Sequence, residues 1–490
     1  MISTRSGTRW PRVPAAFVAT MLSGHSVLGL AFGALIYLVC LTGTAAVFID
    51  ELQVWEQPNA PVVGSVDGAA IGKAMRLAYE AAGSAGLSDV YASPHALRNQ
   101  HLIVAALGQG IDRSWDADAA GSLAVENKAR WSDFVGDLHM TLMLPHPWGG
   151  MLVGIVGVAL FALLLSGVLS HPRIFRDAFA LRLGGSARLR EADLHNRLSV
   201  WGLPFHLAVT LTGAFFGLSF LLVLAVAWAG YGGDTARVTQ VLEGPRIAPD
   251  PAPAPFPDIA AMLAQVPGHP TFVGVENPGT AGQHVLVEAT VPGRLVRGEQ
   301  FFFDGNARLI AKGGFADGAI GLQAYAAAAS LHFGTFGGIP VKLLYGILGL
   351  ALSAISAGGI TIWLIRRRDR GRPARRLEKA WMAVVWGSPI ALALSGAGSL
   401  VAGIPPSPAF WGLLLLIVAV SLAASNGQLV SRRLRWVLVG GLVALVAADV
   451  VRFGPHALTG YAVWVNCAFL AVAGVIGALN GKGRAEPPAA

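Results

Sequence analysis

The chain contains few cysteines and few charged residues. Of its 490 residues only two are cysteine, and 13% are charged. Cys40 and Cys467 both lie in apolar runs, and no Cys-x-x-Cys-His motif is present, so a disulfide framework and covalently attached haem are not expected. With 54% hydrophobic residues, the composition is too apolar for a soluble protein of this length.

Motifs for nucleotide binding and hydrolysis are also missing. No Gly-x-Gly-x-x-Gly follows an expected soluble strand, and no Gly-x-x-x-x-Gly-Lys-[Ser/Thr] occurs. His-Glu-x-x-His and a serine nucleophile elbow are absent as well. The chain is therefore not expected to hold its own NAD(P)H or flavin domain, or to be a hydrolase of these classes.

Long apolar runs are what the sequence has instead. Several reach about 20 residues, the length that crosses the hydrocarbon core of a bilayer. They predict a polytopic α-helical membrane protein with eight spans, at residues 17–49, 148–170, 203–229, 340–365, 380–403, 408–426, 434–451 and 457–479.

The basic residues predict the orientation of these spans. With both termini in the cytoplasm, the cytoplasmic segments hold 22 of the 36 Lys and Arg residues, and the two long external segments hold six each. Such an asymmetry follows the positive-inside rule and predicts an N-in, C-in topology. The net charge of +8 thus gives no reason to expect a nucleic-acid partner.

The two external segments, 50–147 and 230–339, predict two small α+β domains. In the first, residues 69–82 have helical spacing, and strand-like segments follow at 87–91 and 101–107, then a hairpin over 114–123. The second repeats this order with a helix at 258–265, strands at 271–276 and 284–290, and a hairpin over 301–309. The predicted organisation is 1–49, 50–147, 148–229, 230–339, 340–379 and a four-helix membrane region at 380–490.

Four histidines recur at matched positions in the two halves of residues 1–365. His25 and His195 each stand seventeen positions before the Thr of a Leu-Thr-Gly triplet, at residues 41–43 and 211–213. His139 and His332 each precede an apolar span and clustered glycines. Histidine is costly in or beside a bilayer, so its duplicated placement indicates a chemical role.

We interpret these histidines as axial ligands of two b-type haems, one near each membrane face, because low-spin iron between two imidazoles suits electron transfer. The inner haem would take its ligands from His25, His171, His195 and His206, and the outer haem from His139 and His332. His206 has no counterpart in the first half, where Ile36 occupies the matching position. It shares a helical face with His195 only if the helix continues through Pro204. The alternative is that interfacial histidines merely cap helices or contact headgroups.

The other histidines are expected to be less informative. His146 lies between two prolines and would be structural or substrate-facing. Surface or loop positions are expected for His95, His101, His269, His284 and His456. Glycines in the second and fourth spans would either let helices approach closely or leave room for a flat macrocycle, at positions 150, 154, 157, 167, 346, 349, 358 and 359.

The order and spacing of several short motifs resemble a known family. These are Asp137-Leu138-His139, Pro145-His146-Pro147-Trp148-Gly149-Gly150, Ser166 to Phe175, Asp193-Leu194-His195-Asn196-Arg197 and Trp201 to His206. Over roughly residues 15–370 the chain is similar to the PepSY-associated transmembrane family, which includes ferric-siderophore reductases of the bacterial inner membrane. The resemblance implies b-type haem on transmembrane histidines and PepSY domains in the periplasm. The last four spans lie outside this pattern.

The sequence thus predicts an inner-membrane oxidoreductase that passes electrons through two haems to a periplasmic ferric siderophore. The donor would be a cytoplasmic reductase or a quinol. Arginines of the second cytoplasmic loop could pair with haem propionates, although topology and lipid contacts explain them too, at positions 173, 176, 182, 188, 190 and 197. Weaker alternatives are a non-redox PepSY scaffold or regulator, and a transporter. Against a transporter, the repeats run parallel and no span is expected to contain a buried carboxylate.

Overall fold

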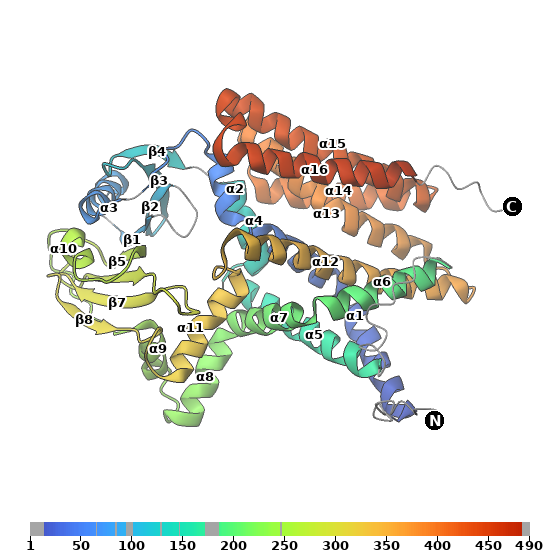
Figure 1. Cartoon of the computed structure of the whole chain (residues 1–490), viewed down its shortest axis with the longest axis horizontal. Helices are drawn as coiled ribbons and strands as arrows, with labels where there is room; N and C mark the ends of the chain where they lie inside the picture. The colour runs from blue at the N-terminus through green and yellow to red at the C-terminus, as the bar shows by residue number, and fades with distance from the viewer. Residues whose placement is uncertain are drawn as a thin grey trace, which may run out of the picture.

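A computed structural model describes residues 14–64, 66–83, 86–94, 101–127, 130–146, 148–171, 186–245 and 247–482. A β-sheet with its covering helices stands at one end of a long helical bundle, and the first described residues and the last lie toward the other end (Figure 1). We call the two ends of the bundle sheet-side and distal. Four residues singled out above, His95, Arg173, Arg176 and Arg182, fall outside the described residues.

The bundle confirms a polytopic helical membrane protein. Within the described residues, seven helices are long and apolar enough to cross a membrane. They are α1 (Ala15–Ala46), α5 (Trp148–Ser170), α12 (Gly338–Asp369), α13 (Arg375–Ala402), α14 (Pro406–Ala423), α15 (Gly427–Phe453) and α16 (Gly460–Lys482). A short 3-10 helix at Gly454–Leu458 joins the last two.

The expected span over 203–229 is wrong as a single helix. The chain instead forms α6 (Ala187–Trp201), α7 (Leu203–Gly217) and α8 (Ser219–Gly230), and the axes of α6 and α7 differ by 74°. Pro204 in the first turn of α7 lacks the N–H that a continuing helix needs, so the chain bends at Gly202. Together α6 and α7 would make an eighth span. His195 and His206 therefore do not share the face of one straight helix.

The sheet-side region contains two copies of a helix and four antiparallel strands. The first copy has α3 (Gly68–Ala82), β1 (Leu87–Pro94), β2 (Leu102–Gly108), β3 (Ile111–Ala117) and β4 (Leu123–Asn127). The second has α10 (Ile259–Leu263), β5 (Pro270–Glu276), β6 (His284–Ala289), β7 (Glu299–Asp304) and β8 (Leu309–Lys312). An additional helix, α9 (Thr235–Glu243), precedes the second copy.

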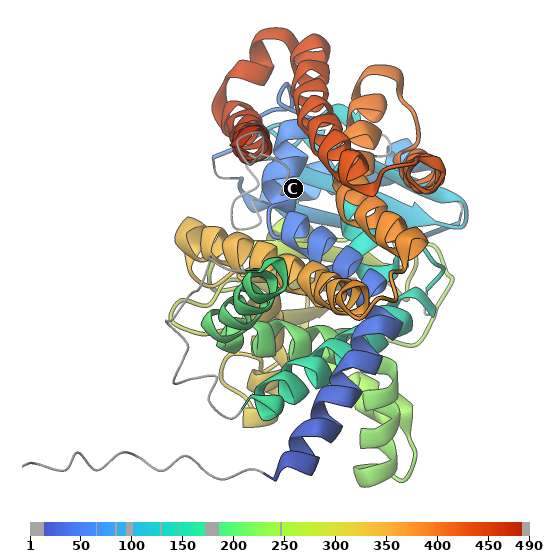
Figure 2. The same cartoon turned by 90° about the vertical axis from the view of Figure 1, so that its right-hand side faces the viewer.

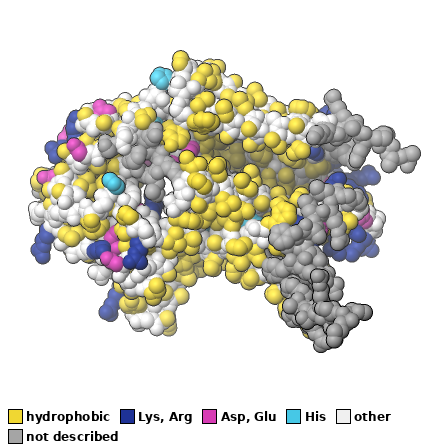
Figure 3. All heavy atoms as spheres, in the orientation of Figure 1, with side chains coloured by type: hydrophobic (Ala, Val, Ile, Leu, Met, Phe, Trp, Pro, Cys, Tyr) yellow, Lys and Arg dark blue, Asp and Glu magenta, His cyan; other side chains and the backbone are white. Residues whose placement is uncertain are grey.

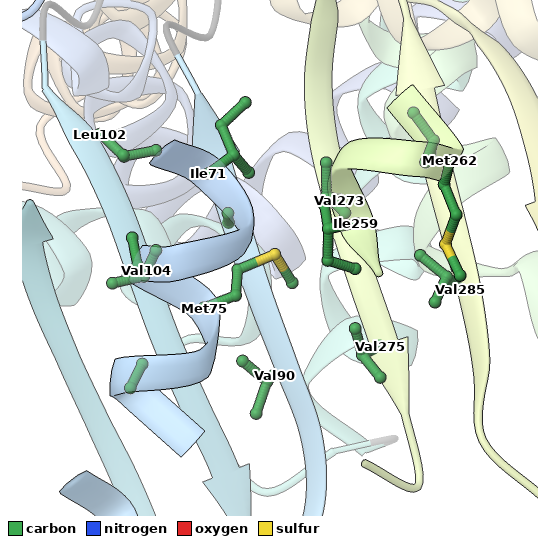
Figure 4. Close-up of a cluster of buried hydrophobic side chains, with 14 of the residues drawn as sticks. Ile71, Met75, Val90, Leu102, Val104, Ile259, Met262, Val273, Val275 and Val285 are labelled. Atoms are coloured by element: carbon green, nitrogen blue, oxygen red, sulfur yellow. The ribbon is translucent and has the colours of Figure 1, made fainter. Parts of the chain in front are cut away.

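The two expected domains share a single sheet. Its strand order is β4-β3-β2-β1-β5-β6-β7-β8, and the central pair β1 and β5 is antiparallel, with Val90 opposite Val275. The two helices cover one face with Ile71, Met75, Ile259 and Met262, which pack on strand valines in one continuous core (Figure 4). Joining the two sheets through β1 and β5 removes two exposed strand edges.

Three shorter helices connect the sheet to the bundle: α2 (Ile49–Glu56), α4 (Trp131–Thr141) and α11 (Ile320–Phe333). The helices α4 and α11 carry His139 and His332. The four C-terminal helices lie together on one side of the bundle (Figure 2), where α13 packs against both α1 and α12. They share a buried core with α2 and α4 that includes Trp55, Trp131 and Phe410.

One buried carboxylate contradicts the sequence analysis. Asp449 in α15 has no exposed surface, and its Oδ2 accepts a 2.6 Å hydrogen bond from Nδ2 of Asn466. The Asn466 side chain in turn accepts a 3.0 Å bond from the indole of Trp55 in α2. The carboxylate thus belongs to a polar contact that fastens the C-terminal helices to the first half of the chain. The expected lack of a buried carboxylate in the spans therefore no longer argues against a transporter.

Candidate functional site

The distal pair consists of His25 on α1 and His195 on α6. Their ring centroids are 6.4 Å apart and the ring planes are nearly perpendicular, at 86°. Two imidazoles on opposite sides of one metal ion, each bonded at about 2 Å, have ring centres roughly 6 Å apart. The separation therefore suits one ion held between the two rings.

The sheet-side pair consists of His139 on α4 and His332 on α11. Their ring centroids are 6.2 Å apart, and here the planes are inclined by only 23°. Along α1, the eighteen residues from His25 to Gly43, which contacts His139, correspond to roughly 27 Å of helix. The two pairs therefore lie near opposite ends of the spans.

Each of the four rings is anchored through Nδ1. His25 bonds the carbonyl of Leu163, His195 that of Ile355, and His139 that of Val39, each at 3.0 Å. Nδ1 of His332 lies 2.9 Å from the hydroxyl of Thr212. A carbonyl can only accept, so Nδ1 of the first three must carry the proton, which leaves the Nε2 lone pair free for a metal.

Glycines face all four rings, and those on the sheet side leave space that a Cβ would fill. A Cβ added to Gly43 would stand 2.6 Å from the His139 ring, and one at Gly213 would stand 3.1 Å from the His332 ring. These are the glycines of the two Leu-Thr-Gly triplets, which explains why the triplets recur. On the distal side, a Cβ at Gly167 would lie 3.4 Å from His25, and Gly359 faces His195.

The other glycines of these spans serve helix packing. Gly154 of α5 meets the backbone of Gly217 in α7, Gly157 meets Ala214, and Gly349 of α12 meets Thr44 of α1. Close helix approach, one of the two explanations offered by the sequence, therefore holds for these glycines, whereas room for a macrocycle stays a prediction.

A cavity of about 540 Å³ adjoins the distal pair. Its size falls in the range of cofactor pockets, and its wall is mostly apolar, with Leu160, Leu163, Ile355 and Ile360 among its members. Two cations, Arg188 and Arg366, also line it. The cavity could therefore take a large flat apolar group that carries negative charge at one edge.

The donor set distinguishes a haem from a bare ion. Within the described part of the chain, no three His, Cys, Asp or Glu side chains gather as a metal site. Two imidazoles alone leave a bare ion short of protein ligands, whereas a porphyrin supplies the four equatorial nitrogens itself. The residues of both pairs fit a haem with two axial histidines.

Comparison with known proteins shows the family to which the chain belongs. The description "PepSY-associated TM region" matches residues 22–366, a stretch that contains both pairs. The chain belongs to the PepSY-associated transmembrane family. It is 30% identical over 363 residues to a protein of Pseudomonas aeruginosa that is named only as uncharacterized, with 67% of this chain and 88% of that protein covered. The family assignment made from the motifs is thus confirmed.

Each pair takes one histidine from each of the two similar halves of residues 1–365, which we call the first and second repeat. His25 and His139 belong to the first repeat, and His195 and His332 to the second. The anchoring carbonyls follow the same duplication, because Leu163 and Ile355 occupy matching places on α5 and α12. Neither repeat therefore completes a pair alone.

The remaining expected ligands do not belong to the two ring pairs. His171 is exposed and lines the same distal cavity as His25 and His195, together with Arg188 and Arg366. His206 is fully buried in α7, where its ring packs against Phe205 and Gly202, and neither nitrogen makes a hydrogen bond of normal geometry with a described residue. His146 is exposed in the turn before α5.

His101 is expected at a surface or loop position; it lies in a bend just before β2 but is not at the surface. Its side chain is 1% exposed, and its Nδ1 lies 3.7 Å from the buried carboxylate of Asp116. Burial lowers the pKa of His101 to about 4 and raises the pKa of Asp116 to about 6. His284 is also largely buried, with Nε2 3.0 Å from Glu276, whereas His269 and His456 are exposed as expected.

The helix that carries His139 is held by the C-terminal bundle, which sequence reasoning missed. Glu56 of α2 accepts hydrogen bonds from the backbone N–H groups of Trp131 and Ser132, at 2.6 and 2.8 Å, and so caps α4. The Trp131 indole donates to the carbonyl of Leu392 in α13, and Phe134 packs on Phe410 of α14. Burial raises the pKa of Glu56 to about 6.

Proposed function

We propose that this protein is an electron carrier with two b-type haems in the bacterial inner membrane, and that it reduces ferric siderophores in the periplasm. The proposal rests on the two imidazole pairs. One lies near each end of the spans, and in each the ring centres are about as far apart as two imidazoles bound to opposite sides of one metal ion. Haem iron supplies reversible one-electron chemistry when bound.

The residues of this chain have distinct parts in that function. His25 and His195 would hold the distal haem, and His139 and His332 the sheet-side haem. The Nδ1 contacts fix ring orientation and raise the basicity of Nε2. Arg188 and Arg366 would face the carboxylates at the edge of the distal macrocycle. The apolar walls exclude water and keep the reorganisation that accompanies electron transfer small.

The orientation follows from the basic residues. Arg366, Arg367 and Arg368 end α12 on the distal side, and the positive-inside rule assigns that side to the cytoplasm. The shared sheet then lies in the periplasm, and the sheet-side pair is the outer haem site. Electrons would leave from this pair.

Reduction suits iron release because siderophores bind Fe(III) through hard oxygen donors and hold the softer Fe(II) more loosely. A haem held by His139 and His332 would supply the single electron that converts the ferric chelate to the ferrous one. No covalent step on the siderophore is required.

The function is tested with reduced protein under anaerobic conditions. Addition of ferric hydroxamate and catecholate siderophores should abolish the reduced b-type band while an Fe(II) chelator traps equivalent ferrous iron. The gallium(III) complexes of the same siderophores cannot be reduced and should leave the band unchanged. A reduced band that persists with every ferric chelate would refute reductase activity and favour the scaffold or transport alternatives, which siderophore counter-flow in proteoliposomes separates.

A further inference from the structure

A second large cavity opens between the C-terminal bundle and α12. It has a volume of about 850 Å³ and is lined from α1, α2 and α4 on one side and from α12 and α16 on the others. We call it the lateral groove. The surface view shows a hollowed apolar zone between the C-terminal helices and α12, with acidic side chains near its sheet-side end (Figure 3).

The walls of the lateral groove are aromatic and aliphatic. Trp131, Trp464, Tyr461, Phe469 and Phe48 all line it. The α16 wall belongs to the C-terminal four-helix region, the part of the chain for which the sequence suggests no role. These walls suit a flat ring that carries a long apolar tail.

The sheet-side end of the groove is polar and has a net negative formal charge. Nζ of Lys342, a side chain only 5% exposed, lies 2.9 Å from Asp50 and 2.8 Å from Glu51. One ammonium thus faces two carboxylates, and both Lys342 and Glu51 line the groove. This arrangement repels the phosphate of a lipid headgroup, whereas a neutral hydroxyl can donate a hydrogen bond to the excess carboxylate.

We propose that the lateral groove binds a quinol, with its hydroxyl-bearing ring at Glu51 and Lys342 and its isoprenoid tail along α16. Such a site would make a quinol the electron donor, and this inference rests on the proposed function. The groove lies at the level of the sheet-side pair along α1: Ala45 lines it, while Gly43, two residues earlier and on another face of the helix, contacts His139. Trp131 lies eight residues before His139 on α4, which is about 12 Å of helix.

The electron count matches two haems. Oxidation of a quinol to the quinone breaks both O–H bonds and yields two protons and two electrons. Two haems held by the two histidine pairs would accept one electron each. The protons pass by Glu51 to Asp50, whose side chain is 29% exposed at the sheet-side surface.

The test measures binding rather than turnover. Full-length protein in phosphatidylcholine nanodiscs is titrated with decylubiquinol and decylubiquinone, with tryptophan fluorescence quenching as readout. We expect saturable quenching by both. Ala468→Trp fills the groove from α16 and should weaken both ligands at least about tenfold, because it removes the space for the ring. The matched control Val475→Trp adds the same side chain to the 60% exposed outer face of α16 and should change neither affinity.

A second variant tests the polar end without filling the groove. Glu51→Gln keeps the shape but loses the charge, so decylubiquinol should bind about three to ten times more weakly while decylubiquinone is unaffected. Absence of saturable quenching, an unchanged affinity in Ala468→Trp, or a co-purifying phosphatidylethanolamine that quinol does not displace would each overturn the proposal. Haem is recorded separately by absorbance, so loss of haem with intact quinol binding contradicts the proposed function alone.

Discussion

The two histidine pairs have the same spacing but different supports. The distal histidines sit on α1 and α6 beside a cavity with two arginines in its wall. The sheet-side pair depends on α4, an eleven-residue helix that Glu56 caps and that α13 and α14 hold by Trp131 and Phe134. The difference teaches that the repeats define where the ligands are, while the added C-terminal bundle packs directly on the helix that carries His139.

Loss of single ligands should separate the pairs most strongly. We expect His25→Ala and His332→Ala each to lose one of two haems, and a different one, because each removes an axial ligand from one pair only. Haem content per chain and low-spin electron paramagnetic resonance signals measure this. Equal loss of both haems in either variant would show that the pairs are not independent sites.

The next largest effect is expected at the glycines. Gly43→Ala places a methyl group 2.6 Å from the His139 ring and should strongly reduce sheet-side haem. Gly167→Ala is the matched variant, since its methyl group lies 3.4 Å from His25, in ordinary contact. Distal haem content should remain close to that of the wild type. A similar loss in both variants would contradict the assignment of steric room.

A smaller effect is expected where Glu56 of α2 caps α4. Glu56→Ala leaves two buried N–H groups of α4 without their acceptor, at a cost of about 1–3 kcal/mol. We expect a shifted midpoint potential and broadened signal of the sheet-side haem alone in a redox titration. Asp67→Ala removes the cap of α3, a helix without a ligand, and serves as control. A matching shift of the distal haem would argue against selective support.

The smallest effect concerns the arginines. Arg188→Gln removes one positive charge from the wall of the distal cavity, a group more than half exposed and already 3.6 Å from Asp369. A modest decrease in the distal midpoint potential is expected, because a nearby cation favours the reduced, less positive iron. The sheet-side haem of the same sample is the internal control. An equal shift at both haems would point to a general structural change.

Local patterns in the sequence predicted much of the fold. Alternating residues located β1, β2, β5 and β6 to within a few residues, because each strand has one buried face. The union of the two sheets through Val90 and Val275 was not predictable in this way. Such pairing joins segments more than 180 residues apart and depends on which edges meet.

Hydropathy gave a wrong prediction where the chain changes direction between helices. Residues 203–229 are apolar throughout, so they read as one span, yet Gly202 and Leu218 end the helices there. Composition reports that a segment prefers lipid but not the direction in which it runs. Asp449 was missed for a related reason, since its burial comes from Asn466 on a different helix.

The sequence predicted those residues of the site that are duplicated between the two repeats. Matched offsets indicated His25 with His195 and His139 with His332, and the structure brings these residues together. His206 has no duplicate, and its role as a ligand stays a prediction, as does that of His171. The Glu56 cap and the groove at Glu51 and Lys342 belong to tertiary contacts that no repeat in the sequence reveals.

The central claim is that two imidazole pairs each hold one haem, and the most direct measurement is the amount of haem b per chain in protein purified after haem-replete expression, together with its reduced-minus-oxidised spectrum. The account predicts two b-type haems per chain, both low-spin and six-coordinate. A chain that folds with its sheet and bundle intact but binds no haem would contradict it.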